Sequence, residues 1–164
     1  MATRGIIARK TPEGWSGVYH HWDSYPSGLG QTLYRLYHGY FQRNLAAMLC
    51  VLIDEHRAGW SNINGVDFSK APGWSEEQDR PCCYCHGGRN EPAQALITMQ
   101  SDTLGAEYAY ALDEGRRTMH VFAWWGDGEV FSWRQIAVVD LDGPEPEWGK
   151  VLSLQASIVN WSQD

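Results

Sequence analysis

The pattern of hydrophobic and polar positions predicts strands at the start of the chain, helices in the middle and strands again in the second half. Short apolar runs over residues 3–10 and 15–22 flank a turn that contains Pro12 and Gly14, which predicts an N-terminal β-hairpin. From Leu29 the apolar residues recur at helical spacing, and a second helix is predicted over residues 42–56.

Four further segments alternate between apolar and polar residues and predict strands: residues 95–100, 107–112, 118–124 and 129–140. Asp142 precedes prolines and acidic residues, which predicts that it caps a C-terminal helix that includes Ile158 and Val159.

The segment between Trp60 and Arg80 is rich in Asn, Gly and Pro and predicts a long loop. We therefore expect a single domain over residues 1–164, of the α+β class, with an antiparallel sheet, an N-terminal hairpin, two central helices and a C-terminal helix.

Charge and composition narrow the classes of partner. The net charge is −7 and the basic residues are scattered, so binding of duplex nucleic acid is not expected. The longest apolar run, residues 45–53, is shorter than the ~20 residues of a membrane helix, and the first residues lack the apolar stretch of a signal peptide. We expect a cytoplasmic protein with reduced thiols. The nine Trp residues fit either an aromatic core or an aromatic pocket.

Residues 19–30 combine two imidazoles, a carboxylate and several rings with Pro and Gly before the first helix. On a strand His21 and Asp23 share a face, and a carboxylate beside an imidazole can orient a general base, so both are candidate catalytic residues. The pair could equally bind a metal, or be an ordinary structural pair at a turn. The free amides near Gly28 are candidates for binding an anion.

A second cluster lies in residues 81–91. Cys82 and Cys85 have C-x-x-C spacing, and Cys83 and His86 repeat that spacing. These four residues are candidate zinc ligands, although a short loop cannot supply a whole tetrahedral site. At least one ligand is therefore expected from elsewhere, and the candidates are Cys50, His20, His56 and His120. The alternative is a set of free thiols.

Thr3-Arg4 followed by the segment from Tyr19 to Tyr25 resembles a group of small uncharacterised phage and prophage proteins. Their pattern begins with Thr-Arg and continues with Tyr-Cys-His-Trp-Asp-Gly-Tyr, so His20 stands here in place of Cys and Ser24 in place of Gly. Residues 84–91 are loosely similar to a later Tyr-Gly-Arg segment of that group. The resemblance implies a phage-encoded accessory protein in the host cytoplasm, of a kind that often acts against host defence, and it implies no particular reaction.

Three hypotheses follow. The first is a binder of a small anionic, nucleotide-like ligand, and its candidate contacts are Arg4, Trp22, Tyr25, Gly28, Tyr84 and Arg89. The second is a hydrolase of such a ligand that uses His21 and Asp23, with or without a metal. The third is an acidic inhibitor that covers a host protein through a surface that includes Glu76 and Glu77. A homo-oligomer is compatible with each.

Overall fold

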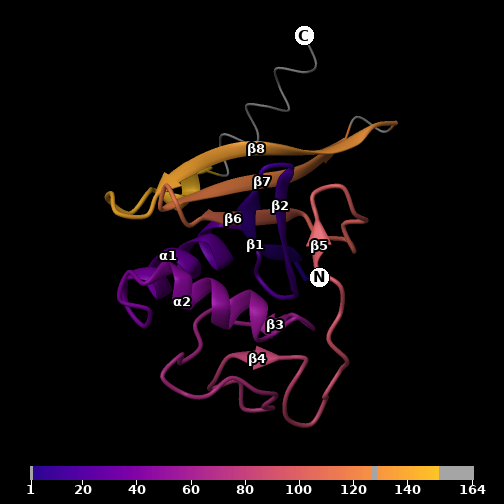
Figure 1. Ribbon diagram of the computed structural model, residues 1–164, viewed down its shortest axis with the longest axis vertical. Coiled ribbons are helices and arrows are strands. Elements are labelled where there is room, and N and C mark those ends of the chain that lie inside the picture. The colour runs from indigo at the N-terminus through magenta and orange to yellow at the C-terminus, as the bar shows by residue number, and fades with distance from the viewer. Residues whose placement is uncertain (1, 127–128, 152–164) are drawn as a thin grey trace.

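The computed structural model describes residues 2–126 and 129–151, and within these residues eight strands form one sheet. The strands are β1 (Gly5–Thr11), β2 (Gly14–His20), β3 (Trp60–Asn62), β4 (Cys82–Cys83), β5 (Ile97–Thr98), β6 (Tyr108–Asp113), β7 (Thr118–Gly126) and β8 (Phe131–Asp140). Their order across the sheet is β4-β3-β2-β1-β6-β7-β8, and β5 pairs with β2. Strands β3 and β4 therefore lie at the opposite side of the molecule from β8 (Figure 1).

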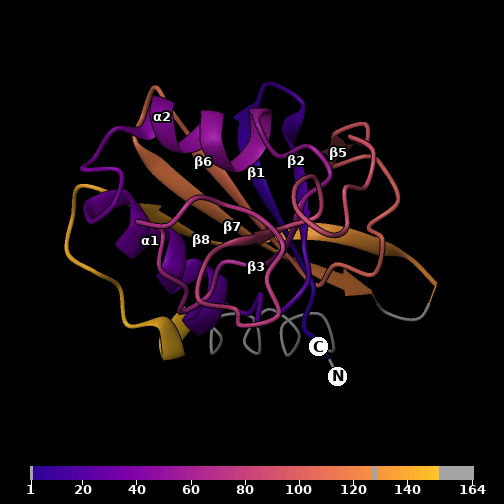
Figure 2. The same ribbon diagram turned by 90° about the horizontal axis from the view of Figure 1, so that it is seen from below.

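The helices cover one face of this sheet (Figures 1 and 2). A π-helical turn η1 (Pro26–Gly30) leads into α1 (Gln31–His38), and α2 (Leu45–Leu49) continues as the π-helical turn η2 (Cys50–Asp54). The helical residues Leu33 and Leu52 are fully buried in one core cluster with Ile7 of the sheet. The opposite face buries a second cluster around Trp15 and Trp133.

The α+β class is confirmed, but the sheet is mixed, whereas the sequence predicted an antiparallel one. Strands β1 and β6 pair in parallel, as do β2 and β3, and the other pairs are antiparallel. In β1 the neighbouring residues Ile6 and Ile7 point to opposite faces and are both fully buried. Burial on both faces is typical of parallel pairs inside a sheet, and the helical segment between β2 and β6 provides the crossover that such a pair needs.

The helices are shorter than the periodicity predicted. The second begins at Leu45, where the Asn44 carboxamide oxygen accepts a hydrogen bond from the Ala47 amide at 3.0 Å and caps the helix. Residues 148–151 are helical, and Ile158 and Val159 of the expected C-terminal helix lie outside the described residues. None of the helices described is both long and apolar enough to cross a bilayer.

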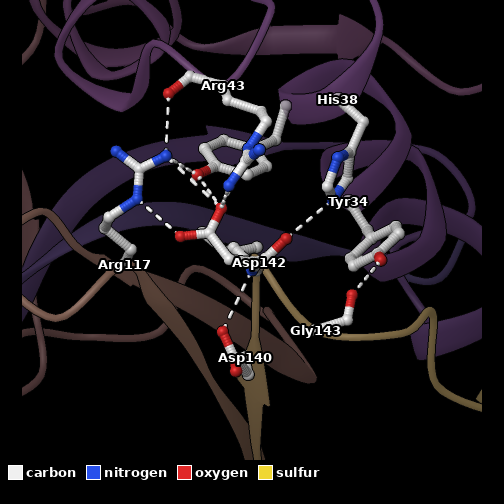
Figure 3. Close-up of polar contacts among 9 residues, drawn as sticks. Tyr34, His38, Arg43, Arg117, Asp140, Asp142 and Gly143 are labelled. Atoms are coloured by element: carbon white, nitrogen blue, oxygen red, sulfur yellow. Dashed lines mark hydrogen bonds and ion pairs between the residues drawn. The ribbon is translucent and has the colours of Figure 1, made fainter.

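The sequence predicted that Asp142 caps a helix, but in the structure its side chain has a different role. Its carboxylate accepts hydrogen bonds from Tyr37 and from the guanidinium groups of Arg43 and Arg117 (Figure 3). These bonds, that of Arg117 first, hold the pKa of Asp142 well below its usual range. Asp142 therefore joins α1, the segment before α2 and the start of β7 at one end of the sheet.

Candidate metal centre and the adjoining pocket

Two thiols and two imidazoles converge beside β3 and β4. The ligand-capable atoms of His56, Cys83, Cys85 and His86 all lie within 4.8 Å of one another. Cys83 Sγ is 3.4 Å from His86 Nδ1, and Cys85 Sγ is 3.9 Å from His56 Nδ1. The four side chains together could hold a metal ion.

The pairing of β3 with β4 brings these residues together from distant parts of the chain. His56 follows the end of η2, and Gly59, with φ of +87°, turns the chain into β3. In the sheet Trp60 of β3 lies opposite Cys83 of β4. The Tyr84 amide then donates to the Gly59 carbonyl at 3.1 Å, which fixes the start of the Cys-His segment next to the helix end.

The cluster is buried on the side of the helix and open at its outer edge. His56 is 5% exposed and its ring packs 4.5 Å from that of Trp60, whereas His86 is exposed. Burial, with a smaller effect of the neighbouring His86, lowers the pKa of His56 to about 4. Burial also raises the pKa of the Cys83 thiol. His56 is thus already neutral at neutral pH, the form that binds a metal, and a thiol ligand would release its proton on binding.

Cys82 lies outside this group, although the sequence made it a candidate ligand. Adjacent strand residues point to opposite faces of a sheet, and its thiol approaches the backbone carbonyls of Ser75 at 3.6 Å and Arg80 at 3.5 Å. Of the four candidate ligands from elsewhere in the chain, His56 is the one that the fold places at the cluster. The remaining candidates have other neighbours: Cys50 approaches Glu55, His20 bonds Ser24, and His120 bonds Gln135.

A pocket of about 640 Å³ adjoins the cluster. Four of the predicted site residues line it: His21, Trp22, Tyr84 and Arg89. The other lining residues are Tyr19, Ala58, Ser61, Trp74, Glu91, Gln94 and Leu104. Of these, Trp74 is an aromatic contact that the sequence analysis missed, and the only available signal was a large ring within a polar loop.

Arg89 forms part of the pocket wall and contacts two aromatic rings. Its guanidinium lies 4.9 Å from the ring centre of Trp74 and 5.3 Å from that of Tyr84, both within cation–π range. The Glu91 carboxylate approaches it at 3.7 Å, so the guanidinium also has a partner of opposite charge. The same arginine thus faces rings and a carboxylate while remaining exposed.

His21 enters the pocket with a hydroxyl partner. Its Nδ1 lies 2.7 Å from the Tyr19 hydroxyl, and its ring meets that of Trp22 edge to face at 4.7 Å. Burial, together with the positive charges of Arg4 and Arg89, lowers the pKa of His21. Burial raises the pKa of Tyr19, so at neutral pH a protonated phenol and a neutral imidazole share this hydrogen bond.

The structure does not bring Asp23 next to His21. Strand β2 ends at His20, and Asp23 adopts a left-handed backbone with φ of +52°, so the alternation that would align the two side chains is lost. Asp23 lines a different pocket of about 510 Å³, which it shares with Tyr25 and Gly28. The residues that the sequence proposed as one site therefore line two separate pockets.

Arg4 does not line the pocket that contains His21. Its guanidinium packs against Gly105, where an added Cβ would lie only 2.7 Å from Nη1. Its charge nevertheless reaches the pocket, because it helps to lower the pKa of His21 and partly offsets the rise that burial causes in the pKa of Tyr19. Arg4 thus acts as a nearby positive charge.

The fold and the site define an α+β protein with a Cys₂His₂ cluster beside an aromatic pocket. No protein-family model matches the chain, and neither a curated protein nor a solved structure is significantly similar to it. A function for this protein is therefore argued from the geometry of the site.

Proposed function

We propose that this protein binds one Zn²⁺ ion in the Cys₂His₂ cluster and a small anionic, nucleotide-like ligand in the pocket beside it. The observation that carries the proposal is the convergence of His56, Cys83, Cys85 and His86 at one point. Their loop also supplies the pocket residues Tyr84 and Arg89, so the two sites share one segment.

The donor set favours zinc among the divalent metals. Zinc in structural sites takes four Cys and His ligands in a tetrahedron, with bonds of about 2.3 Å to sulfur and about 2.0 Å to nitrogen. Those bond lengths require sulfur and nitrogen ligands to lie about 3.6 Å apart. The sulfur–nitrogen distances of 3.4 Å for Cys83 and His86 and 3.9 Å for Cys85 and His56 are close to that spacing. Four protein ligands make a closed site, which supports a structural rather than a catalytic metal.

Metal analysis of the purified protein tests the zinc proposal. We expect one zinc per chain in the wild type and in Cys82→Ser, because that thiol lies outside the cluster. Cys83→Ser should lose the metal. Zinc at equal stoichiometry in both variants, or no zinc in the wild type, would contradict the proposal.

The pocket lining supports a ligand with a planar ring and negative charge. Trp22 is 42% exposed at the pocket, and Trp74 and Tyr84 offer further ring faces for stacking. Arg89 provides a guanidinium for a phosphate or carboxylate, and Arg4 adds a positive charge nearby. A nucleotide combines these properties. The likeness to phage proteins makes nucleotide signals of host defence the first ligands to test.

A nucleotide panel monitored by thermal shift tests this binding. Trp22→Ala should weaken the affinity for the best ligand about tenfold, because one stacked base is worth about 1–3 kcal/mol. The thermal shift at a fixed ligand concentration should fall accordingly. The matched control is Phe131→Ala, which removes an exposed ring on β8. Equal ligand response in the two variants would place the ligand elsewhere, and no response to any nucleotide would overturn the nucleotide assignment.

The hydrogen bond between Tyr19 and His21 supports a second candidate function, hydrolysis of the bound ligand. A neutral imidazole that is oriented by a hydroxyl can act as a general base. Chromatography of the incubated ligand separates the two functions, since recovery of intact ligand supports binding alone. If the ligand is altered, His21→Ala should abolish the turnover, and undiminished turnover would exclude His21 from the reaction.

A further inference from the structure

The metal cluster and the pocket are built by one turn of chain. Cys83, Cys85 and His86 supply three of the four ligand-capable side chains, and Tyr84 between them faces the pocket. Tyr84 lies between Cys83 and Cys85 in the chain, so the metal ligands and the pocket residue share one short backbone segment. Any ion that fixes the three ligands therefore also fixes the backbone that carries Tyr84.

The contacts around the turn extend this dependence to the other rings of the pocket. The Trp74 amide donates to the carbonyl of His86 at 3.2 Å, so a metal-ligand residue also holds the backbone of Trp74. Gly87 follows with φ of +76°, and a Cβ there would lie 2.9 Å from the Trp74 nitrogen. The chain thus turns tightly against Trp74 directly after the last metal ligand.

A second hydrogen bond closes the turn around Arg89. The Glu91 amide donates to the Tyr84 carbonyl at 2.6 Å, which brings Arg89 back over the rings of Tyr84 and Trp74. Apart from these bonds and ring contacts, the turn is weakly anchored, because residues 86–90 are exposed and lie outside helices and strands. A segment with so few buried contacts is expected to open readily on its own.

We propose that the metal at His56, Cys83, Cys85 and His86 controls the aromatic pocket, so that its removal releases Trp74, Tyr84 and Arg89 from one another and weakens ligand binding. This inference rests on the proposed zinc and ligand sites and adds their coupling. His56 anchors the cluster at the end of η2. With the ion bound, the exposed turn is therefore coordinated together with a buried residue, and without the ion it keeps the hydrogen bonds and ring contacts described above but loses this coordination.

The test that needs no ligand is cleavage by trypsin after Arg89, compared in the zinc-loaded protein, after removal of zinc by a chelator, and after zinc is restored. Cleavage should be about tenfold faster without zinc, because proteolysis follows the population of the open form, and restored zinc should protect again. Arg116 lies in the exposed turn between β6 and β7 and provides an internal control site. Its cleavage should not change.

Each outcome bears on a different part of the account. Equal cleavage after Arg89 with and without zinc, in a protein that binds one zinc, would overturn the coupling and leave the metal site standing. Faster cleavage after both Arg89 and Arg116 would also overturn it, because the metal would then hold the whole fold. A protein that takes no zinc would refute the proposed metal site itself, and the coupling with it.

Two additional measurements keep the inference testable in variants and with ligand. His86→Ala removes an exposed ligand with little disturbance of the core, and it should show fast cleavage after Arg89 even when zinc is added. Slow cleavage in this variant would contradict the proposal.

The best nucleotide should bind the zinc-loaded protein about tenfold more tightly than the stripped protein, which is within the usual range of coupling between sites. Equal affinities would contradict it.

Discussion

The imidazole of His20 is fully buried, and its two ring nitrogens have partners of opposite kind. The Ile63 amide donates to Nε2 at 3.2 Å, so Nε2 carries no proton and Nδ1 donates to the Ser24 hydroxyl at 2.7 Å. Burial lowers the pKa of His20 to about 3. His20 therefore works as a neutral link between the bend after β2 and the end of β3, whereas the neighbouring His21 faces the pocket.

This environment predicts a pH-dependent stability. Between pH 6.5 and about 3 the unfolded chain binds a proton on His20 that the folded chain excludes. The contribution is complete above pH 6.5 and is lost as the pH falls, with a limiting slope of about 1.4 kcal/mol per pH unit. Urea unfolding at several pH values should show this slope in the wild type.

His20→Gln provides the comparison. The variant should be less stable at neutral pH but should lose less stability on acidification. His56 has a pKa shifted in the same direction and is present in both proteins, so the difference in slope isolates His20. Identical slopes in the two proteins would show that His20 is not the titrating group.

At the scale of single residues, the sequence indicated which kinds of side chain form the site but not where each of them lies in the fold. Polar and ring side chains beside Pro and Gly made His21 and Trp22 candidate site residues, and both line the pocket next to the metal cluster. The separation of Asp23 from His21 depends on one left-handed residue, which Asp tolerates but the sequence does not require. The strand predicted over residues 15–22 therefore extended two residues past the observed end at His20.

At the scale of elements, the long alternating segments were predictable and the short strands were not. Strands β6, β7 and β8 have between six and ten residues, which is enough for an alternating pattern. Strands β3 and β4 have three and two residues and show no period. Because their pairing brings His56 to Cys83, the sequence could offer His56 only as one of several candidates for the fourth ligand.

The same pairing predicts how the metal contributes to stability. Zinc in thousandfold excess over its Kd should stabilise the fold by about 4 kcal/mol, which raises Tm by about 2–4 °C per kcal/mol in a domain of this size. Calorimetry with and without zinc should show this rise for the wild type and for Cys82→Ser. Cys83→Ser should show none. A zinc-dependent rise of equal size in Cys83→Ser would exclude that thiol as a ligand.

At the scale of the whole molecule, contacts between distant segments decide features that local patterns cannot. Parallel pairing of β1 with β6 joins residues that lie about a hundred positions apart, so the sequence predicted a sheet but not its mixed order. Asp142 lies in a sequence typical of a helix start. The fold instead uses its carboxylate to hold Arg43 and Arg117, which come from two other parts of the chain.

Asp142→Asn should therefore loosen one end of the molecule. The amide removes a negative charge that faces two guanidinium groups, so Tm should fall more than in Glu147→Gln, a control whose carboxylate is 72% exposed. Because the fold lowers the pKa of Asp142, its ionised carboxylate contributes stability at pH values above 3.8, the pKa of this group in the unfolded chain. This contribution is lost as the pH falls further. The difference in Tm between wild type and variant should thus shrink in strong acid, and a constant difference would argue against the ion pairs.

The measurement that tests the central claim most directly is anomalous diffraction at the zinc absorption edge from crystals of the purified protein. The account predicts a peak about 2.3 Å from the sulfur atoms of Cys83 and Cys85 and about 2.0 Å from nitrogen atoms of His56 and His86. The rings of Trp74 and Tyr84 should lie against Arg89 in the same crystal. Absence of a peak among these four residues, or a disulfide between Cys83 and Cys85, would contradict the account.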